Sequence, residues 1–251
     1  MKEKQLQQKK RRILWGWILA VLLLSISMGT VNVQAAKLKL NKTKVTVYKG
    51  CTETLKVTGS KKKVKWSSSK KAVASVSSSG KIKGKKKGTT VIYAKVGKQT
   101  LKCKVTVKEP SNAQRLNLAK KEARKIVKKY VISNLNTKER AFVLFQYLTE
   151  HCCWQLNQST EAYKKNYGNE AYAALILKKA ACSGYARAYK LLCEAAGIPV
   201  RHVNAGSWTH QWNEIKANGK WIKVDAYGGT FADTTGIRKS LLKENKNKEQ
   251  L

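Results

Sequence analysis

Hydrophobic and polar residues alternate with a period of two through residues 37–108, whereas later segments repeat their apolar residues at helical spacing. In the first region, short runs rich in valine, isoleucine and threonine end at turn signals such as Lys49-Gly50. Evenly spaced runs of this kind are typical of an all-β sandwich, with the lysines on the outward positions of each strand. We therefore expect strands near residues 45–48, 54–57, 64–66, 73–76, 90–94 and 101–107.

Beyond about residue 112 the pattern combines helices with strands. Apolar side chains recur every three or four residues over about 113–132, which predicts an amphipathic helix. Asn136 followed by Glu139 resembles a capping box, so we expect a second helix to begin there. The expected apolar faces of these two helices comprise Leu116, Ala119, Ala123, Ile126, Val127 and Tyr130, and then Ala141, Leu144, Phe145 and Leu148.

A third helix is predicted to begin at Cys182, and Gly197 with Pro199 two residues later supplies its stop signal. This pattern places Cys182 in the first helical turn, on the inward side. Unpaired backbone N–H groups and the helix dipole favour the thiolate form of a cysteine at such a position. The backbone N–H of Cys182 is also a candidate donor to an oxyanion.

A β-hairpin is predicted around Asn218-Gly219, which lies between two alternating runs and is a strong signal for a type I′ turn. In that register Ala217 pairs with Lys220, and counting outward places His210 opposite Tyr227.

Asp225 is then the diagonal neighbour of His210 on the same face of the hairpin. Diagonal partners stand about 7–8 Å apart at Cα, a distance that an imidazole and a carboxylate can bridge. The chain has two aspartates, and the other, Asp233, lies beyond the predicted ladder. Asp225 is therefore the expected partner of His210.

Cys182, His210 and Asp225 are the parts of an acyl-transfer enzyme. A thiolate attacks an amide carbonyl, an imidazole accepts and returns protons, and a carboxylate holds the imidazole in the required tautomer. No second oxyanion donor can be assigned from the sequence. Candidates for that donor or for substrate contacts are Tyr172, Tyr185, Trp208 and Trp212.

The same residues resemble the transglutaminase-like superfamily over roughly 137–232. The matching motifs are Cys182-Ser183-Gly184-Tyr185-Ala186, His210 with Trp212-Asn213, and Gly219-Lys220-Trp221 leading to Val224-Asp225. The resemblance implies an α+β fold of the papain-like kind with Cys182, His210 and Asp225 as catalytic residues. The family usually has proline after the triad aspartate, where this chain has Ala226. Members crosslink glutamine to amines, deamidate or cleave peptides, and some are inactive.

Residues 37–108 resemble the bacterial immunoglobulin-like domain, group 2. The motifs that carry this resemblance are Trp66-Ser67-Ser68-Ser69, Val73-Ala74-Ser75-Val76, Gly80-Lys81-Ile82, Gly88-Thr89-Thr90 and the closing Lys104-Val105-Thr106-Val107. The resemblance implies a spacer or adhesive module without catalysis.

The first 36 residues are typical of a secretory signal peptide. A basic stretch over 2–12 precedes a mostly apolar stretch over 13–29, and Val33-Gln34-Ala35 is a small-residue cleavage pattern. An uncleaved anchor is the alternative, but the apolar stretch is short for a membrane span. Export would place the chain at the cell surface or outside the cell, where disulfides persist.

Charge is concentrated in the first region. The whole chain has 52 basic against 14 acidic residues, a net charge of +38, and residues 37–108 hold 22 lysines, one glutamate and no arginine. This excess predicts either attraction to cell-wall polyanions or a solvated surface that promotes solubility. Lysines lack the bidentate geometry of arginine, and aromatic residues are few here, so we expect no sequence-specific nucleic-acid binding.

The remaining cysteines leave several pairings open. Cys51 and Cys103 lie at two strand-like segments and are candidates for a disulfide, while Cys193 is a candidate partner of Cys152 or Cys153, or a free core thiol. His151-Cys152-Cys153 contains the residue types of a metal site, but three consecutive helical residues point in different directions and cannot bind one ion together. We therefore interpret this segment as a helix end. We expect no metal site and no cofactor, and the catalytic region has no acidic loop suited to calcium.

The sequence thus predicts an all-β immunoglobulin-like sandwich followed by an α+β transglutaminase-like domain. The expected division is a signal peptide at 1–36, the immunoglobulin-like domain at 37–108, a linker with an amphipathic helix at 109–136, the transglutaminase-like domain at 137–235 and a polar tail at 236–251. The expected function is acyl transfer on protein or peptide amides at the cell envelope. The alternative is a non-catalytic surface adhesion protein with a degenerate scaffold.

Overall fold

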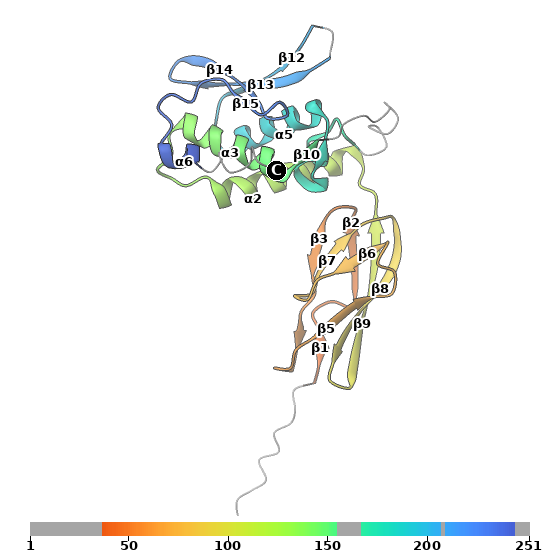
Figure 1. Ribbon diagram of the computed structural model, residues 1–251. Coiled ribbons are helices and arrows are strands. Elements are labelled where there is room, and N and C mark those ends of the chain that lie inside the picture. The colour runs from red at the N-terminus through yellow and green to blue at the C-terminus, as the bar shows by residue number, and fades with distance from the viewer. Residues whose placement is uncertain (1–36, 155–166, 207–208, 244–251) are drawn as a thin grey trace, which may run out of the picture. The chain divides into compact units, whose positions relative to one another are not determined.

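The computed structural model describes residues 37–154, 167–206 and 209–243 (Figure 1). Outside the described residues lie the expected signal peptide, residues 155–166, Trp208 and residues 244–251 of the expected polar tail. Among the residues that are described, no helix is both long and apolar enough to cross a membrane.

The first region is β-rich, as the alternation predicted. A four-stranded sheet has the order β2-β9-β8-β5, in which β2 and β9 run parallel, and a three-stranded sheet has the order β3-β7-β6. The strands are β1 (Lys39–Leu40), β2 (Lys44–Tyr48), β3 (Thr52–Thr54), β4 (Val57–Thr58), β5 (Lys65–Ser68), β6 (Ala74–Val76), β7 (Lys81–Gly84), β8 (Gly88–Val96) and β9 (Gln99–Lys108).

The core of this region lies between the inward faces of its strands. Residues alternate between buried and exposed along β7, β8 and β9, so each strand contributes every second side chain to the core. Ile82, Ile92, Cys103 and Val105 have no exposed surface. Strand β7 was not among the six expected strands, because its single apolar core residue, Ile82, stands among lysines and glycines.

The second region has an α+β fold with an antiparallel sheet of order β12-β13-β14-β15 (Figure 1). Helices α2, α3 and α5 supply the other layer, and the shared core combines apolar residues of both layers. The elements are α2 (Asn112–Tyr130), α3 (Thr137–His151), β10 (Cys153–Trp154), the π-helix η2 (Ala173–Leu177), β11 (Lys179–Ala180), α5 (Cys182–Ala195), β12 (Val200–Asn204), β13 (Gln211–Ala217), β14 (Lys220–Asp225), β15 (Thr230–Phe231) and α6 (Lys239–Lys243).

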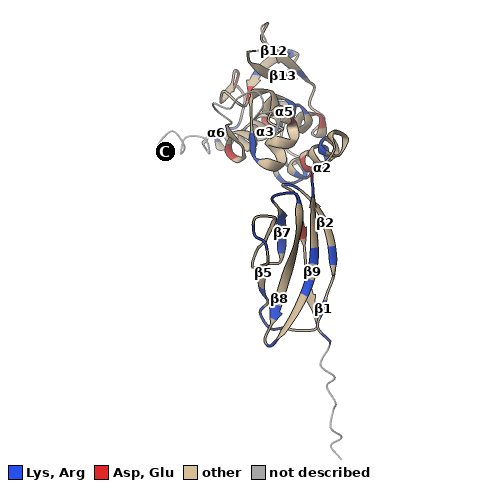
Figure 2. Cartoon of the chain, turned by 90° about the vertical axis from the view of Figure 1, so that its right-hand side faces the viewer, with Lys and Arg blue, Asp and Glu red and all other residues tan. Residues whose placement is uncertain are grey.

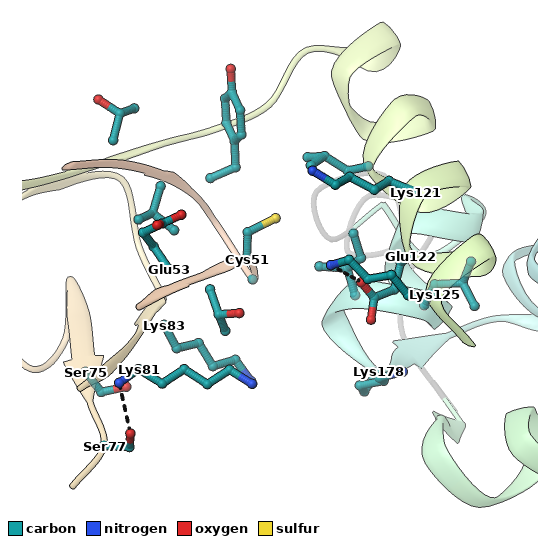
Figure 3. Close-up of a pocket in the computed structure, with 18 of the residues that line it drawn as sticks. Cys51, Glu53, Ser75, Ser77, Lys81, Lys83, Lys121, Glu122, Lys125 and Lys178 are labelled. Carbon is teal, nitrogen blue, oxygen red and sulfur yellow. Dashed lines mark hydrogen bonds and ion pairs between the residues drawn. The ribbon is translucent and has the colours of Figure 1, made fainter. Parts of the chain in front are cut away.

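Helix α2 confirms the predicted amphipathic helix but differs at one turn of its apolar face. Leu116 was expected to be buried and is 48% exposed, whereas the neighbouring Arg115 is 7% exposed. Arg115 donates to both carboxylate oxygens of Glu170 at 2.6 and 2.7 Å. A bidentate ion pair of this kind satisfies the buried guanidinium, which explains why it takes an inward position. On another part of α2, Lys125 and Glu122 form an exposed ion pair (Figure 3).

Helix α3 begins with the predicted capping box. The side chain of Asn136 accepts from the Glu139 backbone N–H, and the Glu139 carboxylate accepts from the Asn136 backbone N–H. Glu139 is 3% exposed and also accepts from Arg238 Nε at 2.6 Å. The hydrogen bond from Arg238 is the main reason that the pKa of Glu139 is lowered to about 2. Glu139 therefore links the start of α3 to the segment before α6.

We expect Glu139→Gln to lower the free energy of unfolding at pH 7 by roughly 1–3 kcal/mol, because charge-assisted hydrogen bonds are lost at a buried position. The pKa of Glu139 is depressed in the folded state, so its contribution is complete above about pH 4.5 and is lost as the pH falls toward 2. Urea unfolding of both chains from pH 7 to pH 3 measures this. The difference between them should be constant at high pH and shrink below about pH 4.5.

Glu122→Gln is the matched control, since Glu122 forms an exposed ion pair with Lys125. Exposed pairs contribute little, so this change should alter the free energy of unfolding by less than about 0.5 kcal/mol. A difference between wild type and Glu139→Gln that stays the same down to pH 3 would contradict the assignment.

The cysteines are all free thiols in the structure, including Cys51 and Cys103. The disulfide considered between those two is therefore not formed: Cys103 is fully buried in the core of the β-rich region. Cys193 is the free core thiol that was one of its predicted alternatives, and burial raises the pKa of its thiol well above the ordinary range.

Candidate active site

The start of helix α5 holds Cys182 in its first turn, as the sequence predicted. The N-cap residue, Ala181, has an extended backbone and no side chain that caps the helix. The first N–H groups of α5 therefore lack the side-chain acceptor that many helices provide, and they remain suited to an anion. Cys182 is partly exposed.

Close backbone packing fixes the position of this helix start. The Ala181 backbone N–H donates to the carbonyl oxygen of Gly168 at 3.1 Å, and Ser183 Oγ donates to the Asn169 side chain at 2.9 Å. A Cβ at Gly184 would lie 2.3 Å from the Gly168 oxygen. Only glycine fits at position 184, which gives a physical reason for the Cys-Ser-Gly order of the motif.

The hairpin of β13 and β14 has the predicted register. Ala217 pairs with Lys220, and Asn218 and Gly219 both have positive φ angles, as a type I′ turn requires. The paired positions end at Asn213 opposite Val224. His210 therefore lies just before β13 rather than within the ladder, with its ring 6.0 Å from that of Tyr227.

His210 and Asp225 are in direct contact. The distance between His210 Nε2 and Asp225 Oδ2 is 2.6 Å, and the second oxygen, Oδ1, accepts from the Gly228 backbone N–H at 2.8 Å. The side chain of Asp225 is 8% exposed and that of His210 is 35% exposed. Because Nε2 of His210 is hydrogen-bonded to Asp225, the other ring nitrogen, Nδ1, is the one that can contact a reacting group. This geometry orients the imidazole and stabilises a positive charge on it.

Two aromatic rings lie close to the ring of His210. The ring of Trp212 is stacked at 6.1 Å, and Tyr227 lies at a similar distance in a tilted arrangement. Tyr227 also packs edge to face on Tyr185, a fully buried residue of α5, at 5.4 Å. Tyr227 thus connects the turn after Asp225 to the helix that carries Cys182.

The four residues considered as oxyanion or substrate candidates have different surroundings. Tyr172 is 1% exposed and packs edge to face on Tyr167. Tyr185 is also buried, and its hydroxyl donates to the Cys152 carbonyl oxygen. Both are therefore core residues. Trp212 lies beside His210, and Trp208 lies outside the described residues.

Sequence reasoning missed Gly228 and Tyr227 as parts of the site. Gly228 was given no role from the sequence, yet its backbone N–H donates to Asp225 Oδ1. Two glycines three and four positions after an aspartate at a strand end were the available signal, since they permit a tight turn back to that side chain. Tyr227 was identified by register but given no role.

The other histidines lie apart from this arrangement. His202 Nε2 is 2.9 Å from Gln211 Oε1, and burial lowers the pKa of His202, which favours the neutral imidazole as the donor. His151 is the last residue of α3 and stacks on Tyr147 at 4.4 Å, so the interpretation of this segment as a helix end is confirmed. Within the described ranges, no group of three or more metal-ligating side chains is present.

The fold combines a β-rich region with an α+β region that carries the candidate site. The family model of the transglutaminase-like superfamily matches residues 124–226, and that of the bacterial Ig-like domain (group 2) matches residues 27–107. The chain therefore carries both domains, the Ig-like domain first, and the two resemblances drawn from its motifs are confirmed.

Several solved structures are similar to parts of the chain, all at low TM-scores. Domains 4 and 5 of the S-layer protein SbsC share 30% identity, covering 28% of this chain and 50% of theirs, at a TM-score of 0.24. A GH10 xylanase from termite gut that contains a bacterial Ig-like domain shares 19% identity, covering 35% of this chain and 23% of its own, at 0.28. A TGase shares 14% identity, covering 59% of this chain and 46% of its own, at 0.38.

The chain thus spans half or less of the length of each of these three structures. Among curated proteins, no significant match is found.

We expect Gly228→Ala to break the contact between His210 and Asp225. The added Cβ would lie 2.8 Å from Asp225 Oδ2, so the carboxylate must move, and Asp225 then loses its fixed orientation toward His210. A crystal structure of the variant should show the distance from Nε2 to the nearer carboxylate oxygen lengthened beyond about 3.5 Å, outside hydrogen-bonding range.

Gly206→Ala is the control, because nothing lies within 4 Å of the added Cβ and the backbone there is not in the left-handed region. Its structure should keep the 2.6 Å contact. An unchanged contact in Gly228→Ala would show that Gly228 does not fix the carboxylate.

Proposed function

We propose that the chain is an exported thiol-dependent acyl-transfer enzyme that acts on protein or peptide amides at the cell envelope. Cys182 is the nucleophile, His210 the general acid and base, and Asp225 the residue that orients His210. The single observation that carries this proposal is the 2.6 Å contact between His210 and a buried Asp225. The match to the transglutaminase-like superfamily supports it, because both residues and Cys182 fall within the matched segment.

In the first half-reaction the Cys182 thiol transfers its proton to His210 Nδ1, and the resulting thiolate attacks the amide carbon of the substrate. A carbon–sulfur bond forms and the carbonyl oxygen becomes an oxyanion. His210 then gives the proton to the departing nitrogen, and the carbon–nitrogen bond breaks to leave a thioester and an amine or ammonia. The negative charge of Asp225 stabilises the imidazolium that exists between these two proton transfers.

The uncapped start of α5 is the proposed source of oxyanion stabilisation. Backbone N–H groups at a helix N-terminus carry partial positive charge and need no reorganisation when negative charge develops nearby. The Cys182 N–H is one such donor, and Ala181 provides no side chain to compete for these groups. Trp212 remains a candidate for substrate contact, since its ring lies beside that of His210.

In the second half-reaction His210 removes a proton from water or from a primary amine, which attacks the thioester and releases Cys182. Water gives hydrolysis of a peptide or deamidation of glutamine, and an amine gives a crosslink.

Proposed export rests on the signal-like segment 1–36 and on the bacterial Ig-like match. No metal or cofactor takes part in the proposed steps.

The central test compares wild type with Cys182→Ala in assays of ammonia release, peptide cleavage and amine incorporation over a varied set of peptides. We expect at least one of these activities in wild type and a loss of about 10³-fold or more in the variant, because the nucleophile is removed. A thiol-directed alkylator should also modify Cys182 faster than Cys153, which is an exposed thiol on β10 and not one of the three proposed catalytic residues.

Cys153→Ala is the matched control and should keep activity within about threefold of wild type. If wild type shows none of the three products and Cys182 reacts no faster than Cys153, the enzyme proposal is wrong. The non-catalytic adhesion protein would then be the better description of the chain.

A second test separates the two aspartates of the chain. Asp225→Asn should lower kcat by about 10²–10⁴-fold, because an amide cannot stabilise the imidazolium and favours the wrong tautomer of His210. Asp233 pairs instead with Lys138 Nζ at 2.7 Å, away from the histidine. Asp233→Asn should therefore lower thermal stability and leave kcat within about threefold of wild type. Equal kcat losses in the two variants would contradict the assigned role of Asp225.

A further inference from the structure

The outward face of the four-stranded sheet β2-β9-β8-β5 is dense in lysine. Six exposed lysines project from it, and we call this surface the lysine face. Figure 2 shows the basic residues along β2, β8 and β9. The residues of the lysine face are Lys44 on β2, Lys102, Lys104 and Lys108 on β9, Lys95 on β8 and Lys65 on β5.

The register of the strands places like charges directly beside each other. Lys44 pairs with Lys104 across the parallel β2 and β9, and Lys65 pairs with Lys95 across the antiparallel β5 and β8. Like charges at paired positions destabilise a sheet. Residues two apart on a strand, such as Lys102 and Lys104, are separated by about 6.8 Å, and neighbouring strands by about 4.8 Å. The lysine face is therefore a close grid of positive charge.

Nothing within the sheet relieves this repulsion. Strands β2, β5, β8 and β9 contain no acidic residue. Across the described part of the chain, no ion pair includes any of the six lysines. The one acidic side chain of residues 37–108 is Glu53, and it pairs with Lys42. No acidic residue of the sheet compensates these like-charge pairs, and an external polyanion would neutralise them.

We propose that the lysine face binds a linear phosphodiester polymer of the cell envelope. The chemistry recognised is a flexible chain with a phosphate at each short repeat, of which poly(glycerol phosphate) is the simplest example. Lysine binds phosphate as a point charge, without the planar fork that arginine offers, so such a surface favours repeated charge over a particular sequence. A shallow hollow of about 310 Å³ beside Lys44, Thr46, Lys104 and Thr106 offers hydroxyl groups next to the charges.

The same observations argue against a nucleic acid as the occupant. Binding of single strands relies on aromatic rings on which bases stack. The lysine face has two tyrosines, Tyr48 on β2 and Tyr93 on β8, and both are half-buried, with Lys102 Nζ 6.0 Å from the ring centre of Tyr93. The face has no arginine to read base edges.

The test measures binding of the full chain to immobilised poly(glycerol phosphate) for wild type and two charge-matched variants. Lys44→Gln/Lys102→Gln/Lys104→Gln removes three charges from the lysine face. Lys81→Gln/Lys83→Gln/Lys86→Gln removes three exposed lysines of β7 and the turn after it, outside the four-stranded sheet. The two variants have the same net charge, so any difference between them reports the position of the lysines.

At about 100 mM salt we expect the lysine-face variant to bind about 10–100-fold more weakly and the control variant less than about threefold more weakly. Wild-type affinity should fall steeply between about 50 and 200 mM salt. The lysine-face variant should also melt no lower than wild type, because the repulsion between Lys44 and Lys104 is removed.

Three results would overturn the proposal. One is an equal loss of affinity in both variants, which would mean that net charge alone acts. Another is tighter wild-type binding to duplex DNA or to a polyuronate than to poly(glycerol phosphate), which would make the assigned occupant wrong. The third is no measurable binding of wild type at 100 mM salt. Enzyme activity does not enter this measurement, so the proposal is tested independently of Cys182.

Discussion

The register of the hairpin formed by β13 and β14 is the constraint on which the candidate active site depends. A two-residue type I′ turn at Asn218 and Gly219 allows a single pairing of the flanking strands. A slip of one residue would turn Asp225 to the opposite face of the sheet and separate it from His210. Two residues on a turn about eight positions away from His210 thus determine whether the imidazole has a carboxylate partner.

The proposed nucleophile, Cys182, depends on a different constraint, the close approach of two backbone segments. Gly184 lies against the Gly168 carbonyl so tightly that no side chain fits, and Tyr185 inserts its full ring into the core one residue later. These contacts hold the first turn of α5 in place while Cys182 itself stays partly exposed. A rigid support for this residue is what the proposed chemistry requires, because small displacements of a reacting atom reduce the rate strongly.

Local patterns predicted the parts of the fold whose geometry is determined by neighbours in sequence. The capping box at Asn136, the start of α5 and the hairpin turn all depend on residues within a few positions of one another, and all were found. The burial of Arg115 was missed because its partner, Glu170, is distant in sequence. The hydrogen bond from the Gly228 N–H to Asp225 was not predicted, because it depends on the conformation of the turn after β14. The roles of Cys182, His210 and Asp225 remain predictions that activity must test.

Acidic residues are used very differently in the two domains. In the transglutaminase-like domain, Glu139, Glu170 and Asp233 each compensate a basic side chain, and Asp225 holds His210. Burial there requires a partner for each charge, since an unpaired buried charge is strongly destabilising. The lysines of the Ig-like domain stay in water, where the Debye length of about 8 Å weakens their repulsion and the apolar core can tolerate it. Folding therefore explains the pairing in one domain, whereas the uncompensated like-charge pairs of the other are the observation behind the proposed binding of an external polyanion.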